Sequence, residues 1–244
     1  MPPRALRSTR AMAAEIIYGT HAVREALRGR RAVLRVWCTR RVGEQGEWLP
    51  DDAIVETSER LEALAASGDH QGVVAEVEPY PYADPAELLG RERALLVALD
   101  EVTDPHNLGA VARVCEGAGA DGLLITRRRS AAVTAAVSRA SAGAVEHLPI
   151  ALVDNLADTL LRARRPGLWT YAADADADSA YDRNDYRDGT LFVLGAEGRG
   201  LRPRVRAACD ATAAIPMRGR IESLNVSTAA AVLLFEAGRQ RRGG

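Results

Sequence analysis

Short apolar runs in the second part of the chain alternate with segments of helical character, and this alternation constrains the fold more than any other feature. Apolar runs of this length are typical of strands that a parallel sheet buries on both faces. The predicted strands are 94–99, 122–125, 148–153, 168–172, 191–194 and 211–215. The predicted helices are 108–118, 130–141, 156–164, 203–208 and 224–239. We therefore predict an α/β domain built on a mostly parallel sheet.

A smaller α/β unit precedes this domain. Its predicted strands are 33–39, 53–56 and 73–78, and its predicted helices are 21–27 and 58–66. Thr20 is expected to cap the first helix and Gly29 to end it. Because proline resists both helix and strand pairing, the proline-rich stretch that follows is interpreted as a linker. The predicted divisions are a basic flexible tail at 1–14, the small unit at 15–79, a linker at 80–92 and the main domain at 93–244.

The composition excludes several classes of protein. Hydrophobic residues make up 47% of the chain, which allows a sizeable core and excludes general disorder. No apolar run approaches the roughly 20 residues of a membrane span, and the first residues lack the apolar stretch of a secretory signal. The 3 cysteines lie far apart without metal-ligand spacing. We expect a soluble, cytoplasmic protein with neither a disulfide framework nor a metal site.

The charges are segregated along the chain although the net charge is only −1. All 32 basic residues are arginine, and they gather in clusters, of which the first includes Arg28, Arg30 and Arg31. The acidic residues concentrate elsewhere, notably between 174 and 188. Such clusters favour phosphate binding, and they are equally compatible with a solvated surface.

Ligands of parallel α/β sheets bind beyond the carboxyl ends of the strands, so the loops that follow the predicted strands are the candidate site. In the first such loop, an Asp-Pro turn precedes Asn107, a predicted helix N-cap, and Arg113 follows six residues later. Together they would offer an amide and a guanidinium that can pair with phosphate. Capping plus a surface arginine explains this segment equally well.

Two further loops stand out. Residues 194–201, LGAEGRGL, contain glycines that let a backbone approach a ligand closely, although a plain tight turn would also use them. The loop has neither GxGxxG spacing nor the GK[ST] ending of a P-loop. Residues 215–227 join the last strand to the last helix and carry Ser223, a possible N-cap, and Asn225. Helix capping alone would account for them.

The three loops together carry a resemblance. NLGAVAR, LGAEGRGL and IPMRGRIESLNVSTA, in this order, resemble the three motifs of the SpoU (TrmH-type) branch of the SPOUT RNA 2′-O-ribose methyltransferases. The likeness extends over residues 94–241. The segments IYGTHAVREAL and DHQGV resemble the small ribosomal-protein-like RNA-binding domain that often precedes the catalytic domain.

The resemblance implies a C-terminal SPOUT domain with a trefoil knot, S-adenosyl-L-methionine as cofactor, RNA as substrate, and a homodimer whose two subunits together form the active centre. Matching the motifs residue by residue yields a set of cofactor-binding residues and a set of catalytic residues. The implied cofactor-binding residues are Leu194, Gly195, Gly198, Ile215, Met217 and Leu224. The implied catalytic residues are Asn107, Arg113, Glu197, Ser223 and Asn225.

The reaction implied is displacement at the sulfonium methyl group by a ribose 2′-hydroxyl. Because arginine stays protonated, Arg113 is expected to hold a phosphate and stabilise the developing alkoxide rather than act as a base. Glu197 is expected to brace Asn107 and the cofactor loop. The amino-acid sequences of the motifs are most similar to those of the enzymes that methylate a guanosine in domain V of 23S rRNA. Another 23S site of the antibiotic-resistance type, tRNA, and an idle RNA-binding assembly factor remain alternatives.

Overall fold

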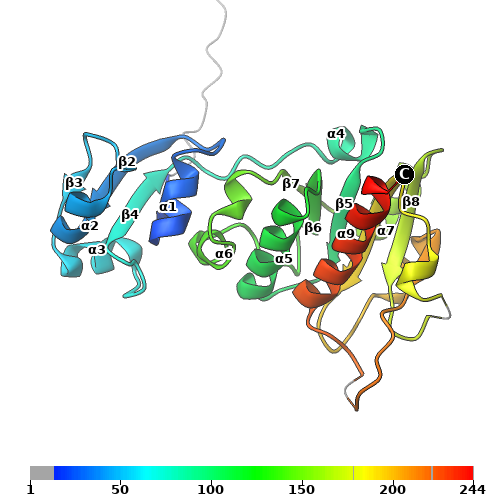
Figure 1. Ribbon diagram of the computed structural model, residues 1–244. Helices are drawn as coiled ribbons and strands as arrows, with labels where there is room; N and C mark the ends of the chain where they lie inside the picture. Colours follow the sequence, from blue (N-terminus) through cyan, green and yellow to red (C-terminus); the bar gives the residue numbers. More distant parts are fainter. Residues whose placement is uncertain (1–13, 178, 221, 244) are drawn as a thin grey trace, which may run out of the picture.

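The computed structural model describes residues 14–177, 179–220 and 222–243. These form a small sheet domain followed by a larger α/β domain, which lie side by side (Figure 1). Nearly all of the predicted basic tail lies outside the described residues. Across the described ranges, no helix has the length and apolar character needed to cross a bilayer.

The small domain contains a four-stranded sheet with the order β1-β4-β2-β3. β4 pairs antiparallel with β1 and β2, while β3 runs parallel to β2. The strands are β1 (Glu15–Tyr18), β2 (Val33–Cys38), β3 (Ile54–Val55) and β4 (Val73–Val77). The helices are α1 (Thr20–Ala26), α2 (Arg40–Gln45) and α3 (Ser58–Ala65). Sequence patterning found all of these elements except β1 and α2.

The start of α1 differs from the prediction. Gly19, with a φ of 98°, is the N-cap, and Thr20 is already helical. The amide of Thr20 donates to Oε1 of Gln71, 3.0 Å away, so a side chain from a distant turn performs the capping. Such a long-range partner is invisible to a local capping rule.

The large domain is built on a six-stranded parallel sheet with the order β10-β8-β9-β5-β6-β7, which confirms the predicted architecture. Its strands are β5 (Leu95–Asp100), β6 (Gly122–Thr126), β7 (Ile150–Val153), β8 (Leu168–Ala173), β9 (Gly189–Gly195) and β10 (Ala211–Ala213). Its α-helices are α4 (Pro85–Gly90), α5 (Pro105–Gly117), α6 (Ala135–Ala140), α7 (Leu156–Ala163), α8 (Pro203–Ala208) and α9 (Val226–Arg242). Two 3-10 turns, η1 (Ala144–Glu146) and η2 (Tyr181–Arg183), complete it.

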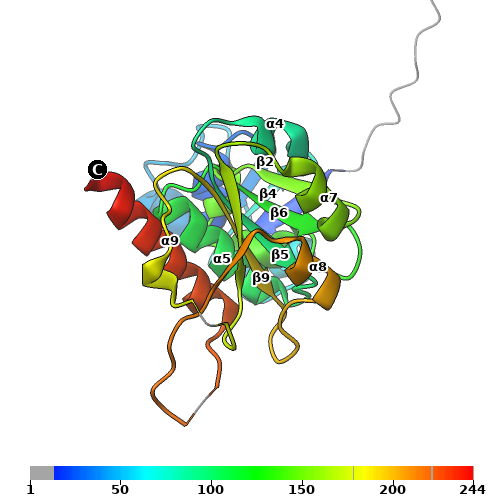
Figure 2. The same ribbon diagram turned by 90° about the vertical axis from the view of Figure 1, so that its right-hand side faces the viewer.

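Helices cover both faces of this sheet (Figure 2). Along β5, alternate residues belong to two separate core clusters: Leu95, Val97 and Leu99 pack with α5 and α9, while Leu96 and Ala98 pack with α4, α7 and α8. This double burial explains why the strands have continuous apolar sequences rather than alternating ones. The loops that follow β5, β9 and β10 are left at the carboxyl edge of the sheet, where the candidate site was expected.

Two helix starts predicted from the motifs are wrong. Asp104, not Asn107, caps α5: its carboxylate accepts from the amide of His106 at 2.9 Å, and Pro105 opens the helix. Asn225, not Ser223, caps α9. In each case an equally good capping residue lies two or three positions away, and the chain path selects between them.

The segment predicted as a linker contains α4, whose Leu88 is buried in the core of the large domain. Ala83 also forms a bridge to Ala151, a residue of β7. The path of the chain fits the knotted topology that the resemblance implies, because the loops after β9 and β10 meet at the carboxyl edge of the sheet.

Candidate active site

Three loops far apart in the sequence meet at the side chain of Asn225. As N-cap of α9, this residue directs its Oδ1 at the amide of Ser227 (2.8 Å), which leaves its Nδ2 free to donate elsewhere. Nδ2 donates to Oδ1 of Asn107 at 2.9 Å and to Oε1 of Glu197 at 2.5 Å. One amide thus joins the first, second and third motifs into a single polar cluster.

The cluster faces solvent. Glu197 and Asn225 are exposed, and Asn107 is half-buried. The predicted contact between Glu197 and Asn107 is replaced by an indirect one, because the carboxylate reaches Asn107 only through the amide of Asn225. Nδ2 of Asn107 and Oε2 of Glu197 keep capacity for another partner, as a substrate-binding site requires, whereas Oδ1 of Asn225 accepts from both the amide and the hydroxyl of Ser227 and its Nδ2 uses both donors.

The glycine loop after β9 folds tightly on itself. The amide of Gly200 donates to the carbonyl of Ala196 at 2.9 Å, and Gly198 and Gly200 have φ values of 73° and 63°. A Cβ atom on Gly195 would lie 2.1 Å from the carbonyl carbon of Gly200. Only glycine at 195 allows this approach, so the motif's glycines shape the loop that carries Glu197.

An ion pair between a buried carboxylate and a partly exposed arginine anchors the same loop to the sheet. Asp100, the last residue of β5, has a fully buried side chain. It accepts from the amide of Arg202 (3.0 Å) and from Nε and Nη2 of the same guanidinium (2.9 and 2.6 Å). These hydrogen bonds raise the pKa of Arg202 above its ordinary value. No sequence motif predicted this pair, although a carboxylate that ends an otherwise apolar strand is a signal of such a partner.

The implied cofactor residues lie in these loops or directly beside them. Leu194 is buried and Ile215 and Leu224 are half-buried, whereas Gly198 is open and Met217 is 36% exposed. Within residues 215–220 and 222–224, no backbone hydrogen bond joins the loop to the rest of the described chain. Unpaired backbone donors and acceptors beside apolar side chains suit a ligand such as S-adenosylmethionine, which has both an adenine edge and an apolar surface.

Two of the predicted catalytic residues stand apart from the cluster. Arg113 lies six residues after Asn107 on α5, which places it about 9 Å further along the helix and about 120° away around it. Its side chain is exposed, and no hydrogen bond or ion pair to another described residue holds it. Ser223 is likewise exposed without a hydrogen-bond partner in the described part of the chain.

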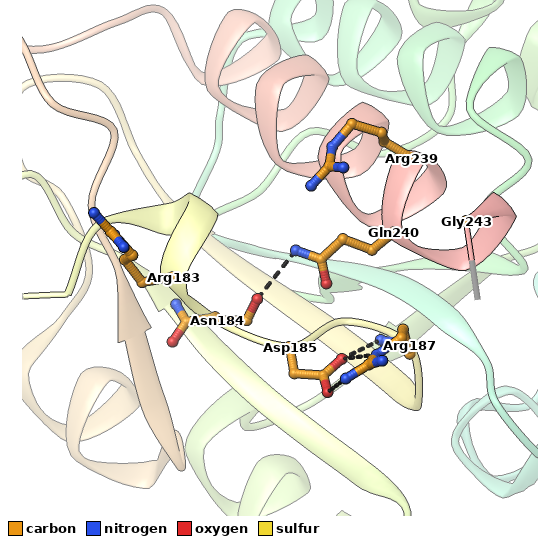
Figure 3. Close-up of a pocket in the computed structure, with 7 residues that line it drawn as sticks. All are labelled: Arg183, Asn184, Asp185, Arg187, Arg239, Gln240 and Gly243. Atoms are coloured by element: carbon orange, nitrogen blue, oxygen red, sulfur yellow. Dashed lines mark hydrogen bonds and ion pairs between the residues drawn. The ribbon is translucent and has the colours of Figure 1, made fainter.

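A cavity of about 380 Å³ lies at the other end of α9 and does not belong to this cluster (Figure 3). Arg239 and Gln240 line it on α9, and Arg183 and Arg187 face them. Gln240 is fifteen residues from Asn225, or about 22 Å along a helix. Among the residues described, no group of three or more His, Cys, Asp or Glu is arranged to hold a metal.

Two of the three arginines that follow α1, whose clustering is compatible with phosphate binding or with a solvated surface, contact the large domain instead. Arg31 is buried against Glu146, and Arg30 donates to the carbonyl of Leu148 at 2.8 Å. Arg28 pairs with Glu25 on its own helix. The clustering therefore reflects a contact between domains for two of these three residues, which the sequence pattern could not distinguish from a basic surface.

Comparisons with known proteins match both domains. The SpoU rRNA Methylase family matches residues 94–235, and the RNA 2′-O ribose methyltransferase substrate-binding family matches residues 16–83. An uncharacterized tRNA/rRNA methyltransferase of Synechocystis is 35% identical over 94% of this chain, and one of Mycolicibacterium vanbaalenii is 46% identical over 75% of it. The chain spans 63% and 60% of the length of these two relatives.

A solved structure resembles both domains together. The SpoU methyltransferase AviRb from Streptomyces viridochromogenes, crystallised with the cofactor AdoMet, superimposes with a TM-score of 0.80 at 27% identity. The superposition covers 95% of this chain and 91% of that one. The likeness therefore extends to the order and folds of both domains.

Proposed function

The chain belongs to the SpoU rRNA Methylase family, and from that premise we propose that it transfers a methyl group from S-adenosylmethionine to a ribose 2′-hydroxyl of RNA. The observation that carries the proposal is the amide of Asn225, which joins Asn107 and Glu197 beside an open loop backbone. The match of residues 16–83 to a substrate-binding family for RNA 2′-O ribose methyltransferases supports RNA as the substrate.

S-adenosylmethionine, when bound, supplies an electrophilic methyl group, and the AdoMet complex of the Streptomyces relative supports this cofactor. We assign its binding to the loop backbone around Gly195, Gly198 and Met217, with Leu194, Ile215 and Leu224 as apolar walls. Because a ligand that binds only the folded state stabilises it, addition of S-adenosylmethionine should raise the melting temperature. A melting temperature that stays constant at millimolar cofactor would contradict the assignment.

The protein's own residues orient the ribose and stabilise charge. The ribose oxygen would take the methyl group, the electron pair of the carbon–sulfur bond would stay on the sulfur as a neutral thioether, and the hydroxyl proton would pass to water. Asn225, held by Glu197, would orient the ribose or the sulfonium end, and Ser223 would join it there. Arg113 would hold the neighbouring phosphate and offset the negative charge that develops on the oxygen.

We propose further that two copies of the chain complete one active centre. The exposed Arg113 is not part of the Asn225 cluster within one chain, and a second copy could bring its own Arg113 to that cluster. Mixing two inactive variants, Arg113→Ala and Asn225→Ala, tests this arrangement. A shared centre predicts that mixed dimers regain activity, because one of their two centres carries both native residues. No gain on mixing would argue that each chain works alone.

As substrate we propose a guanosine in domain V of 23S rRNA. The support is the wording of the first and third motifs, TDPHNLGA and IPMRG, together with the rRNA methylase family match. The relatives are named tRNA/rRNA methyltransferases, which keeps tRNA as the second candidate. The deciding experiment maps 2′-O-methylated nucleotides in the rRNA and tRNA of cells with and without the gene. A site lost only from tRNA would overturn the rRNA assignment.

An in vitro assay tests whether the ribose 2′-oxygen accepts the methyl group. A domain V transcript is incubated with the protein and with S-adenosylmethionine carrying a labelled methyl group. Incorporation should stop when the target guanosine is replaced by its 2′-deoxy form, since the accepting oxygen is then missing. Incorporation into the deoxy transcript would place the methyl group on the base and contradict ribose methylation.

A further inference from the structure

A buried ion pair crosses the boundary between the two domains. The side chains of Arg31, in the small domain, and Glu146, in η1 of the large domain, are only 1% and 0% exposed. Their closest atoms, Nη2 and Oε1, are 2.5 Å apart, and Nε lies 3.3 Å from Oε2. Nη1 of Arg31 donates to Glu15 at 3.0 Å, and Nη2 also reaches Oγ of Ser138 at 3.4 Å. All three guanidinium nitrogens are partnered.

The surroundings of the pair are tightly packed. The guanidinium lies 5.6 Å from the ring centre of Tyr80, whose hydroxyl is 2.9 Å from the carbonyl of Val145. A Cβ atom on Gly29 would lie 2.6 Å from Cβ of Glu146. One on Gly143, which has a φ of 84°, would lie 2.5 Å from Cβ of Glu25. The two domains therefore touch through their backbones, and the ion pair is sealed between them.

Exposed charges surround this contact. His147 lies 2.9 Å from Glu25, and Arg139 lies 2.8 Å from Asp69, each pair crossing from one domain to the other. Solvent weakens such pairs, whereas the enclosed pair of Arg31 and Glu146 is screened little. The enclosed pair therefore dominates the electrostatics of the domain boundary.

The contact leads directly to the candidate active site through α6. Ser138, a partner of Arg31, is a buried residue of α6. α6 packs against α5 at Gly109, where a Cβ atom would lie only 2.5 Å from Cβ of Ala140. Gly109 lies between Asn107 and Arg113 on α5. A continuous packed path thus connects the small domain to the helix that carries two of the proposed catalytic residues.

We propose that Arg31 and Glu146 are positioning residues that fix the small domain in one orientation relative to α5, so that RNA held by the small domain reaches the candidate active site in one register. The proposal rests on the proposed function only for its RNA step. Its physical basis is that the domains are joined by directional hydrogen bonds in an enclosed site, and another orientation of the small domain would break these bonds. Domain orientation is therefore set by a specific bond network rather than by a flexible tether.

The decisive variant replaces both members of the pair, Arg31→Met together with Glu146→Leu. Apolar residues of similar size can restore the stability of a site whose buried charges are removed together, but they cannot restore its directional hydrogen bonds. We expect the double variant to melt near the wild-type temperature and to bind S-adenosylmethionine normally. Its kcat/KM on RNA should fall about ten- to a hundredfold, as expected when reactants are misplaced by an ångström or so.

Two matched single variants serve as controls for the double variant. Glu146→Gln keeps the shape and part of the hydrogen bonding, so its loss of kcat/KM should be smaller than that of the double variant. Arg139→Ala breaks only an exposed pair of the same boundary and should leave kcat/KM within about twofold of wild type. Wild-type kcat/KM in a stably folded double variant would overturn the positioning role.

A measurement independent of activity follows the domain orientation itself. Spin labels are placed on the exposed sites Glu62→Cys in α3 and Arg162→Cys in α7. Burial raises the pKa of the Cys115 thiol and raises that of Cys209 to about 12, which disfavours labelling of these native thiols. Each engineered site is labelled alone to measure any background from the native cysteines. We expect one narrow distance distribution in the wild-type background and a broader one in the double variant.

The spin-label distances and the methylation assay test the domain orientation and the proposed function separately. Equally narrow distributions in wild type and double variant would overturn the fixing of domain orientation, whatever the activity. If the wild-type protein methylates neither rRNA nor tRNA, the proposed function fails. The distance distributions would then still decide whether this pair fixes the domains.

Discussion

The polar cluster at Asn225 and the domain boundary at Arg31 are built from similar groups in opposite surroundings. Both join segments far apart in the sequence, by 118 residues for Asn225 and Asn107 and by 115 for Arg31 and Glu146. At the boundary every guanidinium nitrogen is partnered within the protein and water is excluded. At the cluster the side chains lie at the surface, and those of Asn107 and Glu197 keep unused hydrogen-bonding capacity.

This difference separates two uses of polar residues. An enclosed, fully paired charge resists change, so it suits the fixing of one domain against another. An exposed, prearranged amide and carboxylate can exchange water for a substrate at small cost, so they suit binding and catalysis. The comparison predicts that loss of the contacts at the boundary without replacement lowers stability first, and that substitutions at the cluster lower activity first.

The largest effect is expected from removing the small domain. Deleting residues 1–78 removes Arg31 and exposes to water the surface that the small domain covers, so the large domain loses the hydrogen bonds and the packing of the boundary. The remaining domain should unfold at clearly lower urea concentration than the full chain. An undiminished urea midpoint would show that the boundary contributes nothing to stability.

Arg113→Ala should have the next largest effect, and on activity alone. Loss of a group that stabilises transition-state charge typically lowers kcat by about 10²–10³, equivalent to about 2.7–4 kcal/mol. Because Arg113 is exposed and unpaired among the described residues, the melting temperature should not change. Arg113→Lys should rescue poorly, since lysine cannot make the two parallel hydrogen bonds of a guanidinium. Single-turnover rates near wild type would exclude a catalytic role.

Asn225→Ala should combine a moderate loss of stability with a loss of activity. Removing the N-cap of α9 should cost about 1 kcal/mol. The matched control is Asn155→Ala, which removes the N-cap of α7, a residue whose Oδ1 accepts from the amide of Asp158. Both variants should show similar shifts in urea midpoint, and only Asn225→Ala should lose methylation. Equal activities in the two would remove Asn225 from the proposed site.

The smallest effect is expected at an exposed pair outside both regions. Hydrogen bonds from Arg187 lower the pKa of Asp185 from 3.8 to about 2. The pair therefore stabilises the fold above pH of about 4, where the carboxylate is charged in both states, and this contribution disappears as the pH falls through about 2. Asp185→Asn should slightly lower the urea midpoint at pH 7 and leave it unchanged once the pH is below about 2. If the difference in urea midpoint between wild type and Asp185→Asn grew as the pH fell, the stabilising role of this pair would be contradicted.

Local patterns were sufficient for much of this molecule. The continuous apolar runs predicted the parallel sheet because burial on both faces leaves no polar alternation. Each of the three motifs is contiguous, so its position after a strand could be read directly, and the rule that parallel sheets bind ligands at their carboxyl edge placed all three together. The structure does bring Asn107, Glu197 and Asn225 into contact.

The sequence could not determine which of several equivalent local choices the fold uses, nor the partners of its charges. Asp104 and Asn107 are both acceptable caps for α5, as are Ser223 and Asn225 for α9, and only the path of the chain selects one of each. Arg31 in the sequence is one more arginine of a basic cluster. Its role depends on Glu146, a residue more than a hundred positions away, because burial and pairing belong to the packed structure and leave no local trace.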